Sequence, residues 1–131
     1  MTDRITLVKK AYEAMQYSYS PYSGFKVGAA LLCKNGNIYT GCNIENSAYS
    51  PTNCAERTAF FKAISEGERD FKAIAIVGGK DGEITDYCYP CGVCRQVMAE
   101  FCDRDFEIIT ASPAGIKTYT LKDLLPEAFK I

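Results

Sequence analysis

The sequence contains no histidine, and this absence removes a large part of enzyme chemistry. None of its 131 residues can supply an imidazole. Ser-His-Asp triads, Cys-His nucleophiles and histidine-ligated zinc sites are therefore excluded. Any catalysis by this chain must use a thiolate, a carboxylate, a hydroxyl group or a metal ion.

An excess of charge and a long apolar run are also missing. Lys and Arg number 15 against 16 Asp and Glu, so the chain lacks the basic surplus typical of proteins that bind nucleic acid or anionic membranes. No apolar run approaches about 18 residues and Met1–Arg4 is polar, so we expect no membrane-spanning or targeting segment and a cytoplasmic location. An ordinary globular composition of this length predicts a single domain over residues 1–131.

The spacing of apolar residues predicts helices that alternate with strands. Residues 4–17 have the period of an amphipathic helix, and Asn35-Gly36 predicts a tight turn between strands 25–34 and 37–45. The continuous apolar run 73–77 is typical of a strand buried on both faces. The other predicted elements are helices over 54–66, 91–102 and 121–125, and strands over 106–111 and 117–120. This order favours a layered α/β domain with a mixed sheet and an antiparallel first hairpin.

Cysteine, by contrast, is abundant. An odd number of cysteines, seven, without a secretory signal indicates reduced thiols, some of which can bind metal. Cys54 begins one predicted helix, and Cys91 and Cys94 lie one turn apart at the start of another. A helix N-terminus lowers thiol pKa values and so favours the thiolate that zinc requires. Three thiolates leave the fourth tetrahedral position for water, as in a catalytic zinc site.

The residues around Cys54 complete this hypothesis. Glu56 lies two residues further on, where its carboxylate can reach the open position and move protons without being a ligand. Arg57 can donate hydrogen bonds to thiolate sulfur and so restore acidity to a site with a net charge of −1. Thr52 and Asn53 end the preceding polar loop and are good candidates for the helix N-cap.

Other interpretations of the cysteines stay open at this stage. Cys91 and Cys94 also suit a thiol-disulfide oxidoreductase, although a redox pair explains neither Cys54 nor Glu56. Cys88 could complete a four-thiolate structural zinc site, which is disfavoured because Pro90 marks the helix start after it. The remaining three, Cys33, Cys42 and Cys102, are interpreted as small buried apolar residues.

Two motifs carry a resemblance to a known family. Cys54-Ala55-Glu56 followed by Pro90-Cys91-Gly92-Val93-Cys94 resembles the signature of the zinc-dependent nucleoside and nucleobase deaminases, with cysteine in place of the usual histidine. Further segments are similar to cytidine deaminases of the small, tetrameric type, in the family's order: 21–30, 41–46, 54–59, 90–96 and 124–129.

This resemblance implies a fold, a reaction and a set of site residues. The implied fold has three α/β/α layers around a five-stranded mixed sheet, and the implied reaction is hydrolytic deamination of cytidine and 2′-deoxycytidine to the uracil nucleosides and ammonia. It implies one zinc ion per chain on Cys54, Cys91 and Cys94, with Glu56 as proton shuttle. The implied substrate contacts are Asn43 and Glu45 with the ribose, Phe25 as pocket wall, the N–H of Ala55 with O2, and Tyr49 and Phe129 from neighbouring subunits of a homotetramer.

The predicted ribose site also indicates which substrates to expect. An amide and a carboxylate, Asn43 and Glu45, suit a sugar diol and disfavour a phosphate, since the loop has no Arg/Lys cluster. We therefore expect a free nucleoside as substrate. Blasticidin-type deaminases, the alternative within the superfamily, share the zinc residues but not the set of Phe25, Asn43 and Glu45.

Overall fold

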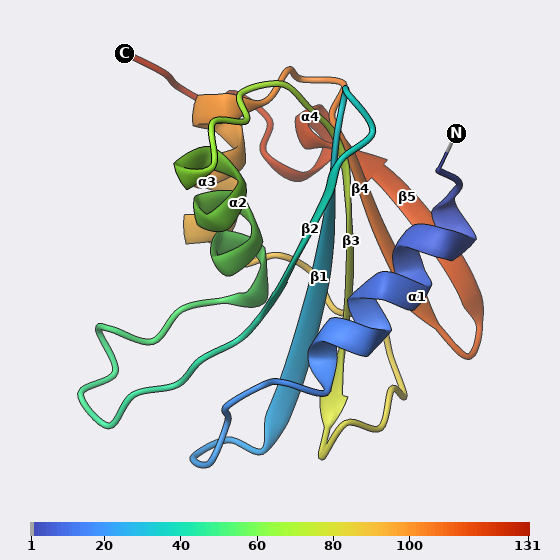
Figure 1. The fold of residues 1–131 in the computed structure, drawn as a ribbon, viewed down its shortest axis with the longest axis vertical. Coiled ribbons are helices and arrows are strands. Elements are labelled where there is room, and N and C mark those ends of the chain that lie inside the picture. The colour runs from blue at the N-terminus through green and yellow to red at the C-terminus, as the bar shows by residue number, and fades with distance from the viewer. Residues whose placement is uncertain (1) are drawn as a thin grey trace.

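A five-stranded sheet between two layers of helices makes up the fold of residues 2–131, which the computed structural model describes (Figure 1). The strands lie in the order β2-β1-β3-β4-β5, and only β3 and β4 are parallel, so the sheet is mixed. The elements along the chain are α1 (Arg4–Met15), β1 (Phe25–Cys33), β2 (Ile38–Cys42), α2 (Ala55–Ser65), β3 (Phe71–Lys80), α3 (Gly92–Phe101), β4 (Glu107–Ser112), β5 (Gly115–Thr120) and α4 (Leu121–Leu124).

The central strand β3 separates two apolar cores. Ile74 and Ile76 point into the core beneath α2 and α3, whereas Ala75 and Val77 point into the core beneath α1. Because successive side chains of a strand face opposite sides, a strand with both faces covered is apolar throughout. The prediction that residues 73–77 are buried on both faces is confirmed, and Figure 1 shows α1 on one side of the sheet and α2 with α3 on the other.

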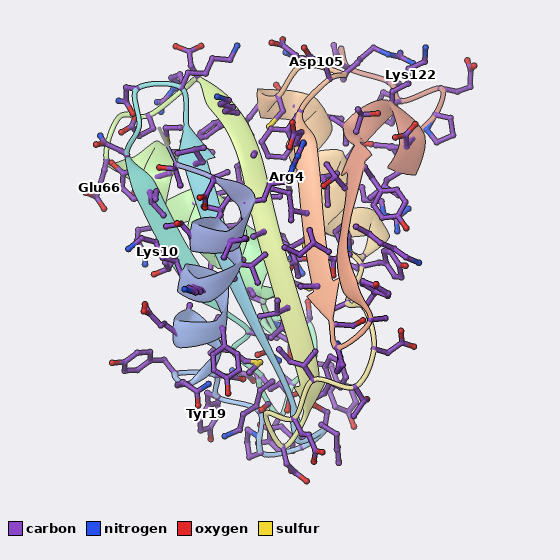
Figure 2. The ribbon with its side chains drawn as sticks, turned by 90° about the vertical axis from the view of Figure 1, so that its right-hand side faces the viewer. Arg4, Lys10, Tyr19, Glu66, Asp105 and Lys122 are labelled. Carbon is purple, nitrogen blue, oxygen red and sulfur yellow. The ribbon has the colours of Figure 1, made fainter. Side chains whose placement is uncertain are left out.

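Helix α1 covers only part of its face of the sheet. Figure 2 shows it over β1 and β3, with β4 and β5 uncovered beside it. Arg4 extends from its first turn to Glu107 at the start of β4, with 3.1 Å between guanidinium and carboxylate. Both side chains are partly exposed, so this ion pair contributes little stability.

The predicted elements are all present, with ends that differ by a few residues. The antiparallel hairpin turns at Asn35-Gly36 as predicted, and β3 is longer than the apolar run because it continues to Lys80. The N-cap prediction was wrong: Cys54, and neither Thr52 nor Asn53, is the N-cap of α2, and its side chain makes no capping hydrogen bond. The Thr52 hydroxyl instead accepts from the N–H of Asn46, and the Asn53 amide donates to Thr58.

Close contact between β2 and α2 positions the N-terminus of that helix. A Cβ on Gly41 would overlap the carbonyl oxygen of Ala55 and lie 2.6 Å from the nitrogen of Ala59. Only glycine therefore lets the first turn of α2 lie this close to the sheet.

Among residues 2–131, no helix has the length and apolarity needed to cross a membrane.

Candidate functional site

Three thiols meet where the N-termini of α2 and α3 approach each other. Cys54 and Cys91 are the N-caps of the two helices, and Cys94 lies in the first turn of α3. The three sulfur atoms lie within 4.8 Å of one another, with 3.6 Å between Cys54 and Cys91 and 3.5 Å between Cys91 and Cys94. Tetrahedral zinc with Zn–S bonds of about 2.3 Å places its sulfur ligands about 3.8 Å apart, so the three thiols fit this ion.

Neither N-cap cysteine uses its side chain to cap its helix, which leaves both sulfur atoms available to a metal. Cys88 is not a member of the group within residues 2–131, so the structure does not bring four thiols together. The arrangement therefore supports three protein ligands and one open position, the pattern of a catalytic site.

Hydrogen bonds to the Cys54 sulfur shift the pKa values of the thiols in this cluster. The Cys94 thiol and the Arg57 guanidinium donate to the Cys54 sulfur and lower the pKa of Cys54 to about 5, with 3.4 Å between Arg57 Nη2 and Sγ. The same hydrogen bond, together with burial, raises the pKa of Cys94 far above its usual range. The Arg57 guanidinium therefore lies beside the Cys54 sulfur.

Glu56 is the buried acid of the site. It lies in the first turn of α2 and only 3% of it is exposed, which is rare for a carboxyl group. Burial, and then the negative charge of Cys54, raise the pKa of Glu56 to about 7. A carboxyl group with this pKa both accepts and releases a proton near neutral pH, as a general acid–base catalyst must.

Asn43 lies just after β2, and most of its hydrogen-bonding capacity is already used. Its side-chain oxygen accepts from the N–H of Val27 at 2.9 Å and from the Ser18 hydroxyl, and its Nδ2 donates to the carbonyl of Phe25 at 2.8 Å. One amide hydrogen is left for a ligand. These contacts orient the amide rigidly against the start of β1.

Glu45 binds the turn that precedes β1. Its carboxylate accepts from the Ser23 hydroxyl at 2.5 Å and from the N–H groups of Tyr22 and Ser23 at 3.0 and 3.1 Å. The hydroxyl bond is the main reason why the pKa of Glu45 is lowered, and this keeps the side chain ionised. Lys80, at the end of β3, donates to the carbonyl of Ser23.

A cavity of about 410 Å³ opens beside Glu45. It is lined by Tyr22, Ser23, Glu45, Asn46, Tyr49 and Thr52. Phe25, predicted to be a pocket wall, lies at the start of β1 and is 41% exposed, but it is not among the residues that line this cavity. The backbone N–H of Ala55 belongs to the first turn of α2, where N–H groups have no partner within the helix and can bind a ligand oxygen.

The two residues predicted to serve neighbouring subunits both have largely exposed side chains. Tyr49 is 79% exposed and has a φ of 63°, a backbone conformation that is rare for a residue with a side chain. Phe129 is 68% exposed and lines a different cavity, with Cys102 and Leu125. The side-chain amide of Gln96 donates a hydrogen bond to the backbone carbonyl of Phe129 at 3.2 Å.

Several residues that hold this site in place were missed by the sequence analysis. Ser18 and Val27 orient Asn43, and Arg95 donates to the carbonyl of Pro90 at 2.7 Å, directly before Cys91. Thr110 contacts the backbone of Cys88 from β4. Ser18, Val27 and Thr110 act through contacts between segments far apart in the chain, which no sequence pattern marks, whereas Arg95 contacts Pro90 five residues before it.

The fold and the thiol-carboxylate site define a class of zinc-binding deaminases, and the comparisons agree. Residues 1–110 match the cytidine and deoxycytidylate deaminase zinc-binding region. The chain is 53% identical to a cytidine deaminase of Sporosarcina psychrophila over 124 residues, covering 94% of this chain and 88% of the relative. It is 51% identical to one of Halalkalibacterium halodurans over 128 residues, covering 97% and 94%.

A solved structure gives the same result in three dimensions. The crystal structure of cytidine deaminase from Burkholderia pseudomallei superimposes with a TM-score of 0.90 at 42% identity, covering 98% of this chain and all of the other. The chain belongs to the cytidine and deoxycytidylate deaminase family. The resemblance stated from the motifs and the implied α/β fold with a five-stranded mixed sheet are both confirmed.

Proposed function

We propose that this protein is a zinc-dependent cytidine deaminase, which hydrolyses cytidine and 2′-deoxycytidine to the uracil nucleosides and ammonia. The observation that carries the proposal is the buried Glu56, with a pKa of about 7, beside three thiols that fit zinc. A redox pair needs neither the third thiol nor the acid, so the same observation disfavours the oxidoreductase alternative. The relatives named cytidine deaminase support the choice of substrate.

Cys54, Cys91 and Cys94 are the proposed ligands of one zinc ion per chain. Zinc bound there lowers the pKa of water and so supplies a nucleophile near neutral pH. Arg57 stabilises the negative charge of the Cys54 thiolate through its hydrogen bond. Three negatively charged thiolates weaken the ability of zinc to lower the pKa of water, and the positive charge of Arg57 offsets part of this effect.

Glu56 carries the protons in the proposed mechanism. It takes up a proton from the attacking water and delivers it to ring N3 of the base, which makes C4 more electrophilic. The water oxygen bonds to C4. Glu56 then moves the remaining proton of that hydroxyl group to the amino group, the C4–N bond breaks and ammonia leaves, so one carboxyl group serves both proton transfers. The N–H of Ala55 binds O2 of the pyrimidine and keeps the ring in place while this happens.

The ribose is assigned to the cavity beside Glu45. The free amide hydrogen of Asn43 and the ionised carboxylate of Glu45 bind its hydroxyl groups, and Phe25 forms the pocket wall. The negative charge of Glu45 repels a phosphate, which favours a nucleoside over a nucleotide. We therefore expect far lower kcat/KM for deoxycytidine monophosphate than for deoxycytidine.

We also propose that the protein is a homotetramer of single-domain chains in the cytoplasm. The rings of Tyr49 and Phe129 are largely exposed, which supports contacts with neighbouring subunits, although Tyr49 also lines the chain's own cavity beside Glu45. Seven free thiols are suited to a reducing compartment. Sedimentation analysis tests the assembly, and Phe129→Ala should lower kcat/KM without loss of zinc.

The test of the proposed function is turnover of cytidine by purified protein of known zinc content. The ultraviolet change from cytidine to uridine is followed with and without a chelator, and about one zinc per chain is expected. Turnover that the chelator abolishes supports the proposal. Zinc without cytidine turnover overturns the substrate and directs the assay to nucleotides and blasticidin S, whereas a metal-free protein with a reducible Cys91–Cys94 pair favours the oxidoreductase.

A further inference from the structure

The segment that leads to Cys91 lacks the backbone hydrogen bonds that would hold it in place. Residues 84–91, which we call the zinc loop, form the larger part of the connection from β3 to α3. Residues 84–90 belong to no helix or strand, and they make no hydrogen bond to another backbone group within the described chain. Side chains from elsewhere must therefore fix this loop.

Thr110 on β4 fixes it at Cys88. Its hydroxyl accepts a hydrogen bond from the N–H of Cys88 at 3.2 Å and donates one to the carbonyl of the same residue at 3.0 Å. A hydroxyl group has one hydrogen to donate and can accept as well, so both functions are directed at one residue of the loop. Thr110 is only 1% exposed, which makes it one of three buried polar or charged side chains in the described structure.

The contact lies close to both parts of the candidate site. A Cβ on Gly78 would lie 3.1 Å from the sulfur of Cys88 and 3.1 Å from the Phe25 ring, so Cys88 and the pocket wall meet at this point of β3. Three residues after Cys88, the chain reaches Cys91. The Arg95 side chain donates a hydrogen bond to the carbonyl of the intervening Pro90.

We propose that Thr110 is a positioning residue of the zinc site: by clamping the backbone of Cys88, it sets the zinc loop so that Cys91 faces Cys54 and Cys94. This inference rests on the proposed zinc function. It assigns a role to a buried hydroxyl whose hydrogen bonds go to the Cys88 backbone, and to Cys88, whose thiol is not in the metal-binding group of the described residues. Partners that orient metal ligands typically change metal affinity or activity by about 10–100-fold when they are removed.

The test compares three variants of the full chain. Thr110→Val keeps the branched shape but removes both hydrogen bonds, whereas Thr110→Ser keeps the hydroxyl. Thr118→Val is the matched control, since Thr118 is exposed on the adjacent strand and pairs with Ile109. Zinc affinity is measured by competition with a chelator, the thiolate-to-cobalt absorption of the Co²⁺ form reports ligand geometry, and urea unfolding of the metal-free proteins reports the fold.

We expect Thr110→Val to bind zinc at least about 10-fold more weakly and to show an altered cobalt spectrum, while Thr110→Ser and Thr118→Val stay within about twofold of wild type. A folded Thr110→Val with wild-type zinc affinity and cobalt spectrum overturns the inference and leaves the proposed function intact. A wild-type chain that binds no zinc overturns both.

A second measurement covers the case in which Thr110→Val does not fold. In the wild-type protein, the clamp predicts slow hydrogen exchange at the Cys88 amide, against fast exchange at its exposed neighbour Tyr89. Equal, fast exchange at the two amides overturns the inference without any substitution.

Discussion

Replacing Glu56 by glutamine should abolish turnover and at the same time stabilise the metal-free fold. The carboxyl group is 3% exposed, and burial raises its pKa from 4.5 to about 7. This difference corresponds to about 3 kcal/mol. Glutamine has nearly the same shape and stays neutral at every pH.

The gain in stability should depend on pH in a defined way. Below pH 4.5 the carboxyl group is protonated in the folded and the unfolded chain, so wild type and Glu56→Gln should be similar. As pH rises from 4.5 through about 7, the unfolded chain loses this proton more readily, and wild-type stability falls. Above pH 7 the variant should be more stable by about 3 kcal/mol, or about 10 °C in Tm.

Turnover should change in the opposite direction. Proton transfer by one positioned group contributes about 10²–10⁴-fold, and Glu56 serves two transfers, so kcat should fall by at least about 10³-fold. The assays are cytidine turnover by the zinc-loaded protein and thermal unfolding of the metal-free protein between pH 4 and 8. Glu66→Gln is the control, because Glu66 is exposed at the other end of α2.

Two outcomes would refute this reasoning separately. A Glu56→Gln enzyme that stays within tenfold of wild-type kcat shows that Glu56 is not the proton shuttle. An unchanged Tm above pH 7 shows that burial does not penalise the ionised carboxyl group, whatever its role in turnover.

Three further results are expected. Cys54→Ser should lose zinc, whereas Cys88→Ser should retain about one zinc per chain by elemental analysis, and equal losses would restore the four-thiolate alternative. Gly41→Ala should destabilise the chain by about 1–3 kcal/mol in urea unfolding because its Cβ meets the first turn of α2, while Gly92→Ala, with open space around its Cβ, should not; similar midpoints for both contradict the close approach. Glu45→Gln should raise KM for cytidine at least about 10-fold with a smaller change in kcat, and an unchanged KM would remove Glu45 from the ribose site.

Part of the site could be predicted from the sequence because the residues concerned lie within one helical turn of each other along the chain. Cys91 and Cys94 lie three residues apart, and a helix places such residues on one side whatever surrounds it. Glu56 and Arg57 follow Cys54 within one turn in the same way. The Asn35-Gly36 turn and the apolar run at 73–77 were equally local, which is why the hairpin and the doubly covered strand were predicted correctly.

The N-cap of α2 shows where local patterns fail. Thr52 and Asn53 have better capping side chains than cysteine, yet Cys54 occupies the cap without a capping bond. Their side chains are used by Asn46 and Thr58, contacts that depend on how the 46–53 loop folds back. Propensity ranks candidates for a position, but tertiary contacts decide among them.

The sequence by itself determined the ligand types, the helical spacing of the thiols and the alternation of helices and strands. Tertiary structure alone decided that Cys54 meets Cys91, that Glu56 is buried deeply enough to hold a pKa of about 7, and that Thr110 reaches Cys88 across 22 residues of sequence. The physical reason is that burial and long-range hydrogen bonds are properties of the packed chain. They set the protonation and orientation of side chains whose identities the sequence already supplies.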